Sequence, residues 1–296
     1  MRRTTLLAFL ARCGLYAVCL LPFTSAQAQW AAVDWTIAET LLAIDAPVGS
    51  VAQQSDYHQW VGEPRIPSSA TDMGLRTQPN FELLAQVPPE QTLISSMFAG
   101  LTPRLERIAP VSSFALYSPG TDTWQEMQTL TRQLGELTER QPQAEALIAQ
   151  TQELMTSLRE TRPPSQAENA PLLMVQFMDA RHVRVFGENS LYNAVLEQLD
   201  LPNAWDQPTN DWGFALVGIE ALARYSEATL VIIDPLPAGV EEQLAKSGLW
   251  QQLPSVKHNH LLRLPPVWSF GALPSAQRFA RELTIALEAH DTVLSD

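Results

Sequence analysis

The chain has 296 residues and is acidic, with 19 basic against 32 acidic side chains and a net charge of −13. This charge disfavours nucleic acid and anionic lipid surfaces as partners, because both would be repelled. The length suffices for two lobes of ordinary size.

The first 28 residues predict a secretory signal peptide. Arg2 and Arg3 form a charged start, an apolar run follows, and a small-residue Ala-Gln-Ala sequence ends at residue 28. A membrane anchor is the alternative, but the run is short and is interrupted by Arg12. The paired arginines also permit twin-arginine export, so the export route stays open. Both cysteines, Cys13 and Cys19, fall in this segment, so the mature chain would have no thiol or disulfide.

Strands and helices alternate in the next part of the chain. A helix end followed by a short strand is predicted in residues 41–52, and further strands are predicted in residues 91–96 and 112–117. Helical patterns lie between them. This alternation is typical of βα units around a buried sheet.

Residues 71–84 predict a tight turn from a strand into a helix, with Arg76 at the junction. Gly74 eases the turn, and Pro79 suits the first turn of a helix, where a missing N–H has no cost. No acidic residue follows Arg76 within five positions. Taken alone, Arg76 is most simply a solvent-exposed loop charge.

Two long helices are predicted in residues 123–161. Thr123 and Glu126 have the spacing of a capping box, and apolar residues follow at helical intervals. Pro142 is expected to start the second helix, which would run to Arg162 and span roughly 30 Å. Residues 162–171 are rich in turn-forming residues and predict a linker.

Beyond the linker, strands are predicted in residues 172–177, 182–187 and 228–234, and helices in residues 190–199 and 275–290. The predicted fold is α/β, with two lobes joined by a single long helix. The expected organisation is a signal peptide in 1–28, an N-terminal lobe in 29–140, a bridging helix in 141–162 and a C-terminal lobe in 163–296. One packed helix would limit large domain closure.

Aromatic side chains gather in turn-rich segments rather than in periodic helices. Trp60, Trp205, Trp212, Trp268 and Phe270 all follow this pattern. Aromatic residues on loops suit a ligand cleft, although each could instead cover the lobe beneath it.

Motifs for catalysis or metal binding are missing. The five histidines are not spaced as converging metal ligands, and no nucleophile elbow, phosphate loop or zinc-protease motif is present. Asp72, Glu82, Glu220 and Asp234 are acidic candidates, but nothing in the sequence pairs them. We therefore expect neither an enzyme nor a direct protein–metal site.

Several segments, in order, resemble periplasmic binding proteins for ferric hydroxamate (ferrichrome-type) siderophores, within the siderophore and vitamin B12 superfamily. They cover nearly all of the expected mature chain, and the run through Trp212 is the most specific: YHQWVGEPRIP, DMGLRTQPNFELL, RIAP, DARHVRVFGENSLYNAVLEQLDLPNAWDQPTNDWG and LPPVWSFGA.

The resemblance implies two Rossmann-like α/β lobes bridged by a helix, with a shallow cleft between them. It also implies a periplasmic monomer that delivers an Fe(III)-hydroxamate siderophore to an inner-membrane ABC permease with its ATPase. The siderophore fills the coordination sphere of the iron, so the protein would need no metal ligands and no cofactor.

Site residues follow from the same resemblance. Arg76 matches an arginine that hydrogen-bonds the hydroxamate oxygens, for which a permanently charged planar guanidinium is a suitable donor. The family's pocket aromatic residues fall on Trp60, Trp205, Trp212, Trp268 and Phe270.

Two positions depart from the family pattern. The tyrosine that donates a second hydrogen bond falls on Phe98, which keeps the ring and loses the donor, so ligand preference is expected to differ. Permease docking uses one acid on each lobe. Glu220 fits the second-lobe position, whereas the first-lobe position is Pro103, and Glu106 is the expected substitute.

Two alternatives stay open. One is a binding protein for another iron complex, cobalamin or haem. The other is a secreted siderophore esterase, which would need a nucleophile near a histidine. The sequence does not identify the hydroxamate, its affinity or the permease.

Overall fold

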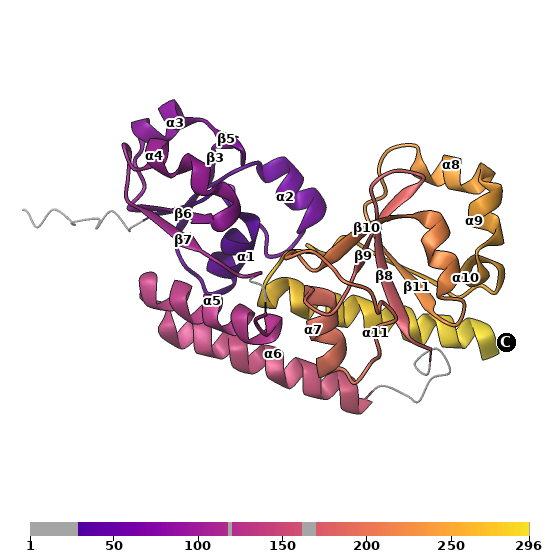
Figure 1. The fold of residues 1–296 in the computed structure, drawn as a ribbon. Helices are drawn as coiled ribbons and strands as arrows, with labels where there is room; N and C mark the ends of the chain where they lie inside the picture. Colours follow the sequence, from indigo (N-terminus) through magenta and orange to yellow (C-terminus); the bar gives the residue numbers. More distant parts are fainter. Residues whose placement is uncertain (1–28, 118–119, 162–169, 296) are drawn as a thin grey trace, which may run out of the picture.

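The computed structural model describes residues 29–117, 120–161 and 170–295, and it contains two α/β lobes (Figure 1). Each lobe is built on a five-stranded sheet. The mixed α/β fold predicted from the sequence is confirmed. The predicted signal peptide, residues 1–28, lies outside the described residues, as does most of the predicted linker.

The N-terminal lobe has a fully parallel sheet in the order β3-β2-β1-β6-β7. All three residues of the central strand are buried, as expected for a strand that is covered on both faces. The strands are β1 (Trp30–Ala32), β2 (Val48–Val51), β3 (Thr71–Asp72), β6 (Gln91–Ser95) and β7 (Val111–Phe114). The helices are α1 (Trp35–Ala43), α2 (Gln54–Trp60), α3 (Phe81–Gln86), the 3₁₀ helix η1 (Ser96–Leu101) and α4 (Thr102–Leu105).

The C-terminal lobe has a mixed sheet in the order β10-β9-β8-β11-β12. Its strands are β8 (Leu172–Phe177), β9 (His182–Phe186), β10 (Phe214–Gly218), β11 (Thr229–Ile233) and β12 (Leu261–Leu264). The helices are α7 (Leu191–Gln198), the 3₁₀ helix η2 (Ile219–Arg224), α8 (Val240–Lys246), α9 (Gly248–Gln252) and α10 (Pro254–Lys257). Strands β9 and β10 are antiparallel to their neighbours. The short turn at 178–181 allows this, because parallel neighbours need a longer crossover.

Three long helices support both lobes. They are α5 (Thr123–Leu137), α6 (Gln141–Thr161) and α11 (Leu273–Ser295), and they run along one side of the molecule (Figure 1). Both α5 and α11 pack against α1 of the N-terminal lobe and α7 of the C-terminal lobe. One continuous apolar core includes residues of both lobes, among them Trp35 of the N-terminal lobe and Val231 of the C-terminal lobe. The lobes are therefore connected by a layer of three helices rather than by α6 alone. No described helix is long and apolar enough to cross a membrane.

The start of α5 differs from the prediction. The capping box predicted at Thr123 and Glu126 is wrong, because Asp122 is the N-cap and accepts a hydrogen bond from the backbone N–H of Gln125 at 3.1 Å. Thr123 instead donates its hydroxyl to the carbonyl of Asn189 in the C-terminal lobe, at 3.1 Å. This contact adds a direct link between the lobes.

The turn around Arg76 is also more elaborate than predicted. Strands β4 (Gly74–Leu75) and β5 (Gln78–Pro79) form a small hairpin, and Arg76 lies in its loop. Pro79 is not in a helix: it ends β5, and Asn80 caps α3 by accepting from the backbone N–H of Leu83 at 3.0 Å. Gly74 has a φ of 78°, a value that glycine adopts without strain.

Candidate functional site

A cavity of about 520 Å³ is lined by side chains of both lobes. It lies where strands end: Asp34 follows β1, Ser96 follows β6, Phe177 ends β8, and Trp268 follows β12. Parallel strands bring their carboxyl ends to one edge of a sheet, the edge at which open α/β sheets bind ligands. The fold thus places two such edges around one cavity.

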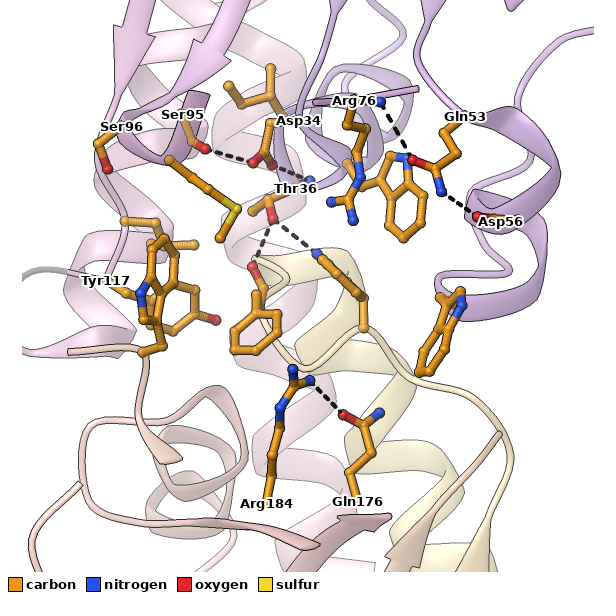
Figure 2. Close-up of a pocket in the computed structure, with 18 of the residues that line it drawn as sticks. Asp34, Thr36, Gln53, Asp56, Arg76, Ser95, Ser96, Tyr117, Gln176 and Arg184 are labelled. Atoms are coloured by element: carbon orange, nitrogen blue, oxygen red, sulfur yellow. Dashed lines mark hydrogen bonds between the residues drawn. The ribbon is translucent and has the colours of Figure 1, made fainter. Parts of the chain in front are cut away.

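Arg76 projects into this cavity from the β4–β5 hairpin (Figure 2). Its guanidinium carbon lies 3.6 Å from the centroid of the Trp35 ring and 5.3 Å from that of Trp268. Its Nε atom is buried and has no hydrogen-bond partner among the described residues. Burial lowers the pKa of Arg76, and the charges of Asp34 and Asp56 oppose that shift. An arginine remains charged at neutral pH under these conditions. Arg76 is therefore a stacked cation with an unused donor.

The hairpin that carries Arg76 is fixed by hydrogen bonds. The backbone N–H of Arg76 donates to Gln53 Oε1 at 3.4 Å. The carboxylate of Asp72 accepts from the backbone N–H groups of Gln53, Gln54 and Gly74, at distances from 2.9 to 3.2 Å. Asp72 thus joins the hairpin to the start of α2, and this is a structural role for one of the acidic candidates.

Aromatic rings line much of the cavity. The Phe270 ring lies 5.3 Å from the Trp268 ring, 6.0 Å from that of Trp212 and 6.3 Å from that of Tyr117, measured between centroids. Trp60, at the end of α2, completes the set from the N-terminal lobe. The structure therefore brings Arg76 together with four of the six predicted aromatic residues: Trp60, Trp212, Trp268 and Phe270.

Hydrogen bonds between the two lobes hold the aromatic residues of the cavity in place. The indole N–H of Trp268 donates to Thr36 Oγ1 at 3.1 Å, and that hydroxyl donates to the carbonyl of Phe270 at 2.7 Å. The hydroxyl of Tyr117 donates to the carbonyl of Gly271 at 2.8 Å. Burial raises the pKa of Tyr117 well above its usual value, so this donor keeps its proton. These hydrogen bonds fix the aromatic side chains of the cavity in the unliganded protein.

Two carboxylates also line the cavity, both from the N-terminal lobe. Asp34 accepts from the backbone N–H of Thr36 at 2.8 Å and from the hydroxyl of Ser95 at 2.7 Å. Asp56 accepts from the side-chain amide of Gln53. Local donors therefore satisfy part of the acceptor capacity of each group.

Arg184, from β9, is the charged residue that the C-terminal lobe contributes to the cavity. Its Nη1 donates to Gln176 Oε1 at 3.3 Å, and its Nε is buried without a partner among the described residues. The guanidinium carbon lies 4.9 Å from the centroid of Phe214 and 5.6 Å from that of Phe270. Figure 2 shows Arg184 and Arg76 approaching the cavity from opposite lobes.

Phe98 and Trp205 are predicted site residues that the structure does not place in the cavity lining. Phe98 is only 5% exposed and packs in a core cluster of the N-terminal lobe, although its ring centroid lies 5.8 Å from the guanidinium carbon of Arg76. The neighbouring Met97 lines the cavity instead and is 50% exposed. Trp205 is buried in the C-terminal lobe, 5.4 Å from the ring of Tyr225. Trp205 thus packs on its own lobe rather than in the cavity. The sequence leaves this alternative open for each of the aromatic residues.

The predicted docking acids are not part of the cavity lining. Glu220 is exposed in the first turn of η2, and Glu106 is exposed at the end of α4. Pro103 is exposed within α4. Helix η2 packs against α9. In Figure 1, α4 and α9 both lie on the side of the molecule away from α6.

The histidines form no site in the described chain. The rings of His258 and His260 are 5.9 Å apart, and neither lines the cavity. Among the described residues, no three His, Cys, Asp or Glu side chains are grouped so that they could hold a metal ion.

Sequence reasoning missed several cavity residues. Arg184, Gln176 and Tyr117 were not singled out, and neither was Asp34. A usable signal existed for two of them, since Asp34 and Gln176 are polar residues at the carboxyl ends of apolar strands. Tyr117 and Arg184 depend on how the two lobes face each other, which local patterns do not report.

Comparison with known proteins identifies the family. Residues 31–267 match the family described as periplasmic binding protein. The chain is 34% identical over 256 residues to the iron(3+)-hydroxamate-binding protein FhuD of Escherichia coli (strain K12), an alignment that covers 86% of each protein.

Solved structures agree with this match. The siderophore-binding protein FhuD of Vibrio cholerae, bound to Fe3+-Desferal, has a TM-score of 0.80 and 29% identity, and the match covers 89% of this chain and 99% of that one. FhuD2 of Staphylococcus aureus with bound ferrioxamine B has a TM-score of 0.70, with 88% and 97% covered. Its identity is only 17%, so it supports the fold alone. From the family match and the extent of the E. coli alignment, the chain belongs to the periplasmic binding protein family.

Proposed function

We propose that this protein is a non-enzymatic binding protein that captures Fe(III)-hydroxamate siderophores in the cavity between its lobes. The observation that carries the proposal is Arg76, a cation stacked on Trp35 inside an aromatic cavity, with a buried Nε that has no partner among the described residues. The E. coli relative is named as an iron(3+)-hydroxamate-binding protein, and the V. cholerae structure holds Fe3+-Desferal, which supports the same ligand class here.

The chemistry of the ligand fits this arrangement. Hydroxamate oxygens that coordinate Fe(III) keep partial negative charge, and a guanidinium hydrogen-bonds such oxygens strongly. The rings of Trp212, Trp268 and Phe270 offer apolar surface to the carbon chains between the hydroxamates. The siderophore completes the coordination of the iron, so the protein recognises a shell and supplies no metal ligand.

We further propose that the protein acts in the periplasm as a monomer and delivers its ligand to an inner-membrane ABC permease. Export would use the signal peptide predicted in residues 1–28. Glu220 and Glu106 would contact the permease, one from each lobe. Both residues are exposed and neither lines the cavity, which supports a role separate from ligand binding.

Titration of tryptophan fluorescence tests the ligand class. Trp60, Trp212 and Trp268 line the cavity, so a coloured ferric hydroxamate should quench a large part of the emission in a saturable way. The metal-free siderophore should bind more weakly, because its arms are not preorganised around iron. Saturable quenching by cobalamin or haem, and none by any ferric hydroxamate, would transfer the assignment to those ligands. Turnover of an ester siderophore that a single Ser→Ala change abolishes would indicate an esterase.

A further inference from the structure

The arginine on the C-terminal side of the cavity, Arg184, has no anionic partner among the residues that the structure describes. Several other arginines pair with carboxylates, for example Arg263 with Asp234 at 3.0 Å and Arg132 with Glu145 at 2.8 Å. For Arg184, no carboxylate of a described residue lies within 4.0 Å; its one hydrogen-bond acceptor is the amide oxygen of Gln176. A neutral amide leaves most of the donor capacity of a guanidinium unused.

Packing holds this cation in a fixed position. Arg184 lies over the ring of Phe214 and near that of Phe270, and Gln176 is only 2% exposed. Gln176 is in turn 3.5 Å from the hydroxyl of Ser269. Burial lowers the pKa of Arg184, which reflects the cost of keeping a partly desolvated charge without a counter-ion. An anion in the cavity would remove that cost.

The cavity is electrically asymmetric. On the N-terminal side, Arg76 shares the lining with Asp34 and Asp56, and both acids act on its charge. On the C-terminal side, Arg184 is the only ionised residue among the described lining residues. An anionic substituent would be repelled by the two carboxylates and attracted by Arg184. The field therefore favours one orientation of a ligand that carries such a group.

We propose that Arg184 is a specificity-determining residue that binds a carboxylate or similar anionic group of the siderophore. The preferred ligands would then be ferric hydroxamates with a negatively charged substituent, directed toward the C-terminal lobe. This inference rests on the proposed function, and it adds a second recognition point to the hydroxamate contact of Arg76. A guanidinium suits a carboxylate because it can donate two parallel hydrogen bonds.

A series of ligands with one iron centre and different tail charge tests the inference. Ferrioxamine B is used with its terminal amine free, acetylated or succinylated, which makes the tail cationic, neutral or anionic. Affinities for the full mature protein are measured by fluorescence titration at low ionic strength. We expect the succinylated complex to bind about tenfold more tightly than the acetylated one, and the free amine to bind most weakly.

Variants assign that preference to one residue. Arg184→Leu should reduce the ratio between the succinylated and acetylated complexes to about one, and Arg184→Lys should keep part of it. Arg181→Leu is the matched control, because Arg181 is exposed outside the cavity and its loss changes the net charge equally. It should keep the full preference. Arg184→Gln replaces Arg184→Leu if the latter does not fold, as judged by circular dichroism.

The outcomes separate this inference from the proposed function. If neither this series nor any other ferric hydroxamate quenches the wild-type protein, hydroxamate binding is rejected and the inference falls with it. If all three bind with equal affinity, hydroxamate binding stands and the anionic subsite is rejected. The subsite is also rejected if Arg184→Leu keeps the tenfold preference.

Discussion

Arg76 carries the proposed contact with the ferric complex, and its environment defines what its loss should do. Arg76→Ala removes a charge-assisted hydrogen bond, so we expect ligand affinity to fall by about 2 kcal/mol, roughly thirtyfold. Calorimetry with ferrioxamine B measures this change. Arg104→Ala is the matched control, because Arg104 also stacks on a ring, at 3.8 Å from the centroid of Phe81, but does not line the cavity. Equal affinities of Arg76→Ala and Arg104→Ala would remove Arg76 from the site.

Phe98 is the position at which the family resemblance implies a hydrogen-bonding tyrosine. By that resemblance alone, Phe98→Tyr would restore a donor and tighten binding. The ring is 5% exposed in a core cluster, so we now expect the added hydroxyl to be buried. Stability should fall by about 1–3 kcal/mol, the cost of an unsatisfied buried hydroxyl, while affinity stays unchanged. Tighter binding at an unchanged melting temperature would instead mean that the hydroxyl reaches the ligand.

Arg76 and Arg184 show what could be predicted at single positions. Arg76 stands in a segment that resembles the family, and the structure places it in the cavity. Arg184 lies between two buried valines of β9, and an alternating pattern of this kind also fits a strand with one solvated face. Its position in the cavity depends on the facing lobe, which no local pattern contains.

The contact between α1 and α11 includes a buried acid that accepts hydrogen bonds from the start of α11. Glu39, on α1, accepts from the backbone N–H of Ala272 at 2.6 Å and from the hydroxyl of Ser275 at 2.5 Å, at the start of α11. Burial raises its pKa to about 8, and the charge of Asp34 adds to this shift. The folded protein thus keeps a proton that the unfolded chain loses near pH 4.5.

The stability of the wild-type protein should therefore decrease between pH 4.5 and about 8 through this group. Glu39→Gln imitates the protonated acid, since its amide can donate to Ser275 while its oxygen accepts from Ala272. We expect the melting temperatures of the two proteins to agree near pH 5, and the variant to melt higher at pH 8. Glu153→Gln, at an exposed position, is the control and should follow the wild type. Parallel curves for Glu39→Gln and the wild type would contradict the raised pKa.

Elements with strong local signals were predictable, and elements with non-local support were not. Strands β6, β8 and β11 are apolar runs, and the sequence located each of them. Helix α2 was missed because its start is supported from elsewhere: Gln53 has a φ of 56° and no side-chain cap, and Asp72 accepts its N–H instead. The β4–β5 hairpin was missed because it is only two residues long on each side.

At the scale of the whole molecule, the proposed docking residues Glu220 and Glu106 are exposed on different lobes and lie outside the cavity lining. Reversing Glu220 to Arg should abolish siderophore uptake in cells while ligand affinity in solution stays intact. Glu106→Arg should do the same if Glu106 takes the role that Pro103 cannot fill. Glu242→Arg, an exposed reversal on α8, is the control. Normal uptake by the Glu220→Arg strain, at equal protein abundance, would leave Glu220 only its favourable position at a helix start.

The central claim is that the cavity between the lobes holds an Fe(III)-hydroxamate complex through Arg76. Anomalous scattering from iron, in crystals of the protein grown with ferrioxamine B, tests it most directly. We predict one iron peak inside the cavity, coordinated only by hydroxamate oxygens, with the Arg76 guanidinium within hydrogen-bond distance of one of them. An iron peak outside the cavity, or iron coordinated by protein side chains, would contradict the account.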